Sequence, residues 1–76
     1  MKSMIDIEYE ASGIELFVRN KYELDDNWFG DSYPEEIKHI ETMMFYADDE
    51  QTYKQLVELL EKTFDEFARN AKGEDR

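Results

Sequence analysis

The chain has 76 residues, no cysteine and a formal net charge of -11. This length predicts a single domain over residues 1–76, with a small core and modest stability. The absence of cysteine excludes disulfides and thiolate metal sites and suits the cytoplasm. No apolar run approaches the roughly 20 residues of a membrane span, and the charged N-terminal residues do not fit a secretory signal. We therefore expect a cytoplasmic protein.

The negative charge is concentrated in the middle of the chain. Residues 25–50 contain nine acidic side chains and one basic side chain, Lys38, so this segment alone contributes -8. Such charge disfavours direct binding to nucleic acid phosphates or anionic membranes. It favours association with a cationic protein surface.

Residues 4–24 are predicted to form a β-hairpin, because apolar and polar side chains alternate along two runs. Ser12-Gly13 lies between the runs and suits a two-residue turn. In this register Asp6 faces Arg19 as an opposite-charge pair. Phe17 falls on the polar face, as a lone exposed ring or as part of a contact surface. The apolar members of the two runs are Ile5, Ile7, Tyr9, Ala11, Ile14, Leu16, Val18, Tyr22 and Leu24.

Residues 25–33 are predicted to form a connecting loop, and the segment that follows is ambiguous. Pro34, Glu35 and Glu36 are typical of the first turn of a helix. The stretch 40–46 could equally form a third strand, which would support a marginal two-stranded hairpin. We favour the strand, which gives the order β-β-β-α, and β-β-α-α is the alternative.

The C-terminal third predicts a long amphipathic helix. Asp48 or Asp49 can cap its start, and Gly73 suits its end. The helix would cover the apolar face of the hairpin. The predicted fold class is therefore α+β, with an antiparallel three-stranded meander packed under one helix. The apolar stripe consists of Tyr53, Leu56, Val57, Leu60, Phe64, Phe67 and Ala71.

The best candidate for a metal site is a partial calcium loop. Asp25, Asn27, Gly30 and Glu36 match the first, third, sixth and twelfth positions of an EF-hand loop. Phe29 occupies the fifth position and supplies no side-chain oxygen. We therefore predict no metal and no cofactor, and keep a calcium-binding loop as the third functional hypothesis.

Catalysis has no candidate residues in this sequence. His39 is the single histidine, and no second histidine or cysteine accompanies it. Glu35 and Glu36 are adjacent, so they do not converge on one substrate. No activated nucleophile or phosphate-binding loop is present either. The sequence predicts a protein that is not an enzyme.

Large aromatic side chains are interleaved with the acids. Trp28 and Phe29 would either close the open end of a small core or serve as exposed anchors, as at interface hot spots. Both interpretations stay open at this point. The residues predicted to bind a partner are Asp25, Asp26, Trp28, Phe29, Asp31, Tyr33, Glu35, Glu36, Asp48 and Asp49.

Several features resemble small acidic accessory proteins of bacteriophages and prophages. They are the run Ile7-Glu8-Tyr9-Glu10, Gly13, Tyr22, the run Pro34-Glu35-Glu36-Ile37, and an acidic C-terminal helix. Some proteins of this kind, including several anti-CRISPR and anti-restriction proteins, resemble DNA in charge and occupy a nucleic-acid channel. The resemblance implies an inhibitor that acts in the cytoplasm of a host cell.

The leading hypothesis is a non-enzymatic protein that docks on a basic, nucleic-acid-binding surface of a host protein and inhibits it. Its carboxylates would stand in for phosphates. The alternative is an interaction or oligomerisation module, in which the hairpin edge or the face of Phe17 pairs with another chain and the acidity serves solubility. We expect a monomer or a weak homodimer.

Overall fold

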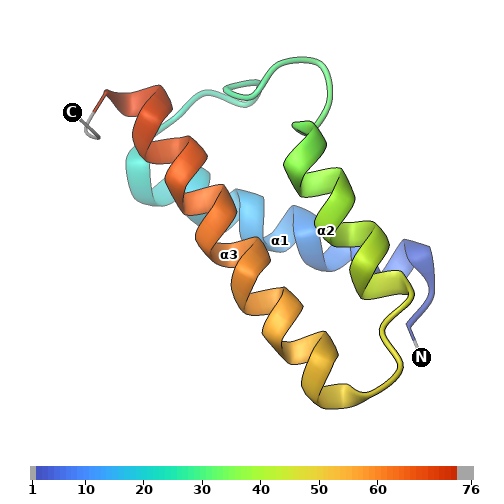
Figure 1. Cartoon of the computed structure of the whole chain (residues 1–76). Helices are drawn as coiled ribbons and strands as arrows, with labels where there is room; N and C mark the ends of the chain where they lie inside the picture. The colour runs from blue at the N-terminus through green and yellow to red at the C-terminus, as the bar shows by residue number, and fades with distance from the viewer. Residues whose placement is uncertain (1, 74–76) are drawn as a thin grey trace.

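A computed structural model describes residues 2–73 and consists of three helices, α1 (Met4–Tyr22), α2 (Glu35–Phe45) and α3 (Glu50–Lys72) (Figure 1). Residues 2–73 contain no strand. α2 and α3 lie side by side and run in opposite directions, and α1 crosses behind both (Figure 1). The predicted α+β class is therefore wrong, and the described chain is all-helical.

The predicted hairpin is replaced by α1, a helix of 19 residues. Ser3 caps its start, because the Ser3 Oγ accepts a hydrogen bond from the Asp6 backbone N–H at 3.1 Å. Glu23 ends it in the left-handed conformation, with φ of 57°. Ser12-Gly13 lies in the middle of this helix and forms no turn. The predicted pairing of Asp6 with Arg19 is therefore wrong as well.

The alternation that suggested a strand arises because α1 is apolar on two opposite faces. Ile7, Ala11 and Val18 are buried, and their spacing of four and seven residues places them on one helical face. Ile5 and Tyr9 lie on the opposite side and are exposed. Apolar residues at positions 5, 7, 9 and 11 therefore mimic a period of two.

The ambiguous segment forms α2, so the third strand over residues 40–46 is wrong and the helical alternative is correct. Pro34 precedes the helix, and its carbonyl accepts the backbone N–H groups of Ile37 and Lys38 at 3.0 and 3.2 Å. Ile37, Ile40 and Met44 are buried at helical spacing. The Pro-Glu-Glu start signal therefore predicted the structure of this segment correctly, and the short apolar run that suggested a strand did not.

The C-terminal helix is confirmed as α3. The Asp49 side chain accepts the Thr52 backbone N–H at 2.7 Å, and this hydrogen bond lowers the pKa of Asp49. Gly73 ends the helix with φ of 82°, a conformation that favours glycine. Leu60 and Phe64 are fully buried.

All three helices contribute to one core, and the α1–α2 connection also packs against it. The Tyr33 ring meets the Phe64 ring edge to face, with centroids 5.4 Å apart. Leu24 and Trp28 contact the same cluster from the connection. The buried apolar residues are Ile7, Ala11, Val18, Ile37, Ile40, Met44, Tyr53, Leu60, Phe64 and Ala68.

Two adjacent leucines of α3 test this packing. Leu60 is 0% exposed, so Leu60→Ala should lower the free energy of unfolding by about 2–5 kcal/mol. Leu59 is 42% exposed, so Leu59→Ala is a matched control that should lower it by less than about 1 kcal/mol. Urea denaturation followed by circular dichroism measures both values. Equal losses for the two variants would contradict the helical orientation of α3.

Candidate functional site

The predicted acidic residues are all exposed and lie on the two sides of α2 in the sequence: Asp25 and Asp26 follow α1, Asp31, Glu35 and Glu36 lie at or just before the start of α2, and Asp48 and Asp49 follow its end. The first group, called the loop cluster, consists of Asp25, Asp26, Asp31, Glu35 and Glu36. The second group, called the turn pair, consists of Asp48 and Asp49. α2 has 11 residues, so it separates Glu35 and Glu36 from the turn pair by roughly 16 Å.

Most of these carboxylates are free of basic partners. Asp26 is the exception, because the Arg19 Nη1 donates to its Oδ1 at 2.9 Å. Asp49 serves as the cap of α3. Within residues 2–73, no Lys, Arg or His lies within ion-pair distance of the remaining five, which are Asp25, Asp31, Glu35, Glu36 and Asp48. These five therefore present uncompensated negative charge.

A buried carboxylate, Glu15, holds the loop cluster in place. Glu15 is 5% exposed. The Arg19 Nε and Nη2 donate to its two oxygens at 3.0 and 3.1 Å. The Trp28 Nε1 donates to the Glu15 Oε2 at 2.8 Å, which ties the α1–α2 connection to α1. These hydrogen bonds satisfy the buried charge, whose burial would otherwise be costly. The sequence analysis did not predict these contacts of Glu15, although Glu15 and Arg19 have the i,i+4 spacing of a helical ion pair.

The three predicted aromatic site residues form a chain that leads into the core. Trp28 contacts Phe29 with ring centroids 5.3 Å apart, and Phe29 contacts Tyr33 at 4.9 Å. Tyr33 then meets the core ring of Phe64. Trp28, Phe29 and Tyr33 are all half-buried. They therefore anchor the connection on the core and still present part of their surface beside the acids.

A second buried carboxylate, Glu41, lies in a groove of about 430 Å³ between α1 and α2. Glu41 is 5% exposed, and its Oε2 has no hydrogen-bond partner among the described residues. Burial raises the pKa of Glu41, the charge of Glu8 raises it further, and Lys38 opposes the shift. Ser12 and Tyr33 bring hydroxyl groups to the same groove. The groove therefore suits a cationic group that could donate a hydrogen bond to Glu41.

The candidate calcium loop is built from tight turns. The Trp28 N–H donates to the Asp25 carbonyl at 3.2 Å, and the Gly30 N–H donates to the Asn27 carbonyl at 2.9 Å. Gly30 has φ of 98°, as such a turn allows for glycine. Residues 2–73 contain no group of three or more His, Asp or Glu side chains arranged to hold a metal ion. The residues that match the EF-hand pattern therefore do not form a cluster of metal ligands.

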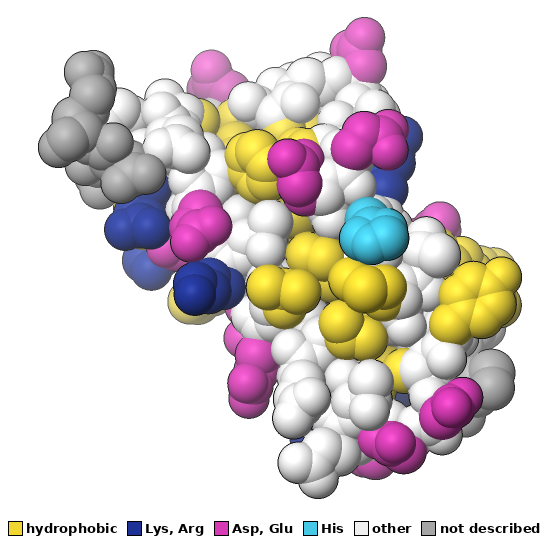
Figure 2. Space-filling model, in the orientation of Figure 1, with side chains coloured by type: hydrophobic (Ala, Val, Ile, Leu, Met, Phe, Trp, Pro, Cys, Tyr) yellow, Lys and Arg dark blue, Asp and Glu magenta, His cyan; other side chains and the backbone are white. Residues whose placement is uncertain are grey.

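The face formed by α2 and α3 shows how acidic and apolar side chains are distributed. In Figure 2, apolar side chains gather in the middle of this face, and charged side chains, both acidic and basic, lie around its edge. Leu59 is among the exposed apolar residues, and Met43 and Leu56 are half-buried. His39 on α2 is exposed. An apolar centre with a charged rim is the usual anatomy of a protein interface.

No protein-family model, curated protein or solved structure matches this chain. Among the described residues, no helix is both long and apolar enough to cross a membrane. The charge and exposure of the described side chains are therefore the observations on which a functional proposal depends.

The contact of Trp28 with Glu15 can be tested by replacing the indole with a smaller ring that has no donor. Trp28→Phe keeps an aromatic ring but leaves the buried carboxylate without one of its donors. It should lower the free energy of unfolding by about 1–3 kcal/mol. Tyr46→Phe removes the hydroxyl of a 71% exposed ring and should change it by less than about 0.5 kcal/mol. Circular dichroism is the readout, because Trp28 is the only tryptophan. If the two variants are equally stable, the Glu15 contact has no structural role.

The burial of Glu41 predicts a dependence of stability on pH. Its pKa is raised above the ordinary glutamate value of 4.5, so the folded chain holds this proton more tightly than the unfolded chain. The contribution of Glu41 to stability is present below that value and is lost as the pH rises through the folded pKa. Glu41→Gln stays neutral at every pH. Its stability relative to wild type should therefore improve as the pH rises from about 4 through the raised pKa of Glu41.

Urea denaturation at several pH values measures this difference. Glu36→Gln is the control, because it removes a negative charge from the exposed start of the same helix. A Glu41→Gln profile that runs parallel to wild type at all pH values would show that the carboxylate is not destabilised by burial.

Proposed function

We propose that this chain is a non-enzymatic binding protein that docks on a basic, nucleic-acid-binding surface of a host protein and inhibits it. The observation that carries the proposal is the set of five exposed carboxylates without a basic partner, in a chain of net charge -11. The resemblance to acidic phage proteins suggests that it acts in the cytoplasm of the host. Direct binding to nucleic acid or to an anionic membrane is disfavoured by charge repulsion.

The support beneath the loop cluster favours binding over simple solubility. A carboxylate that only keeps a protein soluble needs no fixed position. Here the Trp28–Glu15 and Arg19–Asp26 contacts hold the connection that carries the acids. A preorganised surface loses less conformational entropy when it binds. The loop cluster can therefore present carboxylates at defined positions, as a nucleic acid presents phosphates.

The separation of the two acidic groups indicates the shape of the partner surface. The α2 members of the loop cluster, Glu35 and Glu36, and the turn pair lie roughly 16 Å apart, at the two ends of α2. A channel that holds a nucleic acid backbone carries basic side chains over a comparable length, because successive phosphates are spaced along it. An elongated basic groove therefore fits this arrangement better than a single basic pocket.

Glu41 offers a place for one cationic side chain of the partner. Its Oε2 lacks a donor among the described residues, and the groove is lined by Glu8 and by one cation, Lys38, which leaves the carboxylates in excess. An arginine or lysine of the partner would supply a charge-assisted hydrogen bond there. Such a contact would relieve the cost of burying this carboxylate.

Capture and competition together test the function. The full chain, immobilised at low salt, is used to capture proteins from a bacterial lysate, and the captured protein is then purified. The proposal expects affinity that falls steeply as salt rises, and loss of nucleic-acid binding by that protein when the chain is added. A ternary complex, in which the captured protein binds chain and nucleic acid together, would contradict the inhibitor mechanism.

Charge reversal in the loop cluster tests the position of the site. Asp25→Lys with Asp31→Lys should weaken binding to the captured protein by at least about a hundredfold, because lost attraction becomes repulsion. The control is Glu58→Lys with Glu66→Lys, which changes the net charge equally on the exposed side of α3. Isothermal titration calorimetry measures both affinities, and circular dichroism checks that both variants fold. Equal losses would mean that only net charge matters and that the loop cluster is not a defined site.

A further inference from the structure

The outer face of α1 is apolar and is not covered by another part of the described chain. Ile5, Tyr9, Leu16 and Phe17 are 76%, 82%, 46% and 70% exposed. They account for four of the six large apolar side chains that are exposed in the described residues. Ile5, Tyr9 and Leu16, spaced by four and seven residues, lie on the side of the helix opposite the buried residues, and Phe17 flanks them at the groove between α1 and α3. Exposed apolar residues that gather in this way mark an interaction surface.

Gly13 lies in the middle of this face, and the isolated chain gives no reason for it. A Cβ at this position would meet nothing within 4 Å, and its backbone has no positive φ. Glycine inside a helix is less stable than alanine, because it loses more conformational entropy on folding. A small residue at this point is explained if a second backbone approaches α1 closely there.

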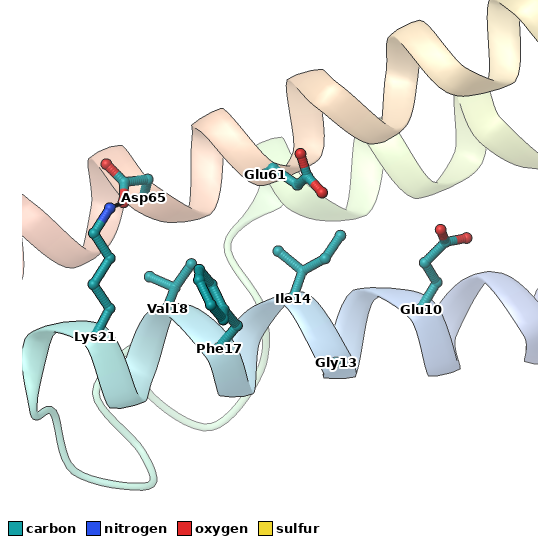
Figure 3. A pocket seen from close by; sticks show the side chains of 8 residues that line it. All are labelled: Glu10, Gly13, Ile14, Phe17, Val18, Lys21, Glu61 and Asp65. Atoms are coloured by element: carbon teal, nitrogen blue, oxygen red, sulfur yellow. Dashed lines mark hydrogen bonds and ion pairs between the residues drawn. The ribbon is translucent and has the colours of Figure 1, made fainter.

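A groove of about 540 Å³ runs between α1 and α3 beside this face. Figure 3 shows Ile14 and Val18 along the groove, with the Phe17 ring between them, and Gly13, which has no side chain, also lines it. Lys21 and Asp65 close one end with an ion pair of 3.0 Å. The apolar middle of the groove can therefore accept an aromatic side chain from outside.

We propose that the occupant of this surface is a second copy of the chain, with the two α1 helices packed antiparallel around a two-fold axis at Gly13. In this register, opposed residues have numbers that sum to 26. Tyr9 then faces Phe17 of the second copy, and the two Gly13 residues face each other. The contact is isologous and closed, so it yields a dimer and not a filament.

The charges of α1 favour this antiparallel arrangement. Asp6, Glu8 and Glu10 lie in the first half of the helix, and the second half holds Arg19 and Lys21 with the buried Glu15, where Arg19 pairs with Glu15 and Asp26 and Lys21 with Asp65. An antiparallel partner brings the acidic half of one helix beside the basic half of the other. A parallel partner would place like charges together. The first 24 residues sum to only -2, since five acids stand against three bases, so this face is far less acidic than residues 25–50.

Sedimentation equilibrium of the full chain tests the proposal, over concentrations from about 1 to about 300 μM. We expect a reversible monomer–dimer equilibrium. Dimerisation should strengthen as salt rises, because screening reduces the repulsion between two chains of net charge -11 while apolar contacts remain. A strict monomer at every concentration and salt level would overturn the proposal and leave the face for a different protein.

Matched variants locate the contact. Tyr9→Lys should raise the dimer dissociation constant by at least about tenfold. Tyr46→Lys alters a ring of similar exposure, 71%, just beyond α2, and should change the constant by less than about twofold. If both variants weaken the dimer equally, the α1 face is not the interface.

Gly13→Gln separates association from folding. Glutamine is a better helix former than glycine, and the space around Gly13 is open, so the melting temperature of dilute monomer should rise. The longer side chain should keep the two helices apart and raise the dimer dissociation constant by at least about tenfold. If this variant dimerises as tightly as wild type, the two helices do not cross at Gly13.

Discussion

The buried carboxylate of Glu15 is the contact on which the arrangement of the site depends. It lies on the core side of α1 and receives hydrogen bonds from Arg19, four residues later, and from Trp28 in the connection. The first contact requires a helix over these residues, because only helical geometry brings i and i+4 side chains together. The second brings the connection back over the bundle. From Trp28 the aromatic chain continues through Phe29 to Tyr33, which packs on Phe64. This chain of contacts fixes the positions of the acids of the loop cluster.

Glu15 and Glu41 show how the same side chain takes two roles at equal burial. Both are 5% exposed. Glu15 receives three hydrogen bonds from two side chains, so its charge is stabilised and it serves the fold. Glu41 has an oxygen without a donor among the described residues, and burial raises its pKa. Within the isolated fold, a carboxylate at position 41 adds no stabilisation. A cationic side chain from a partner would supply what is missing, which links this residue to the proposed function.

The sequence predicts α3 well because one apolar stripe, an Asp cap and a Gly end all agree there. It fails at α1 for a physical reason. Tyr9 and Phe17 put apolar side chains on the solvent side, and Ser12-Gly13 resembles a turn. The capping serine, Ser3, and the buried spacing of Ile7, Ala11 and Val18 were the missed signals. The exposure of the predicted acids follows from their charge. Their division into two groups could not be predicted, since 11 residues span roughly 16 Å as a helix and roughly 36 Å as a strand.

The two proposed surfaces are compatible because they use different parts of the molecule. The loop cluster follows the C-terminal end of α1, and antiparallel packing sends those ends in opposite directions. α1 has 19 residues, so the C-terminal ends of the two α1 helices, which Asp25 and Asp26 follow, would lie on the order of 30 Å apart in a dimer. This separation keeps Asp25 and Asp26 of the two copies away from each other, which lowers the electrostatic cost of dimerisation. It also means that both clusters engage one partner only if its basic surface extends over a similar distance. An extended nucleic-acid channel meets that condition, and the second contact then becomes intramolecular, so the dimer would bind such a channel more tightly than the monomer does.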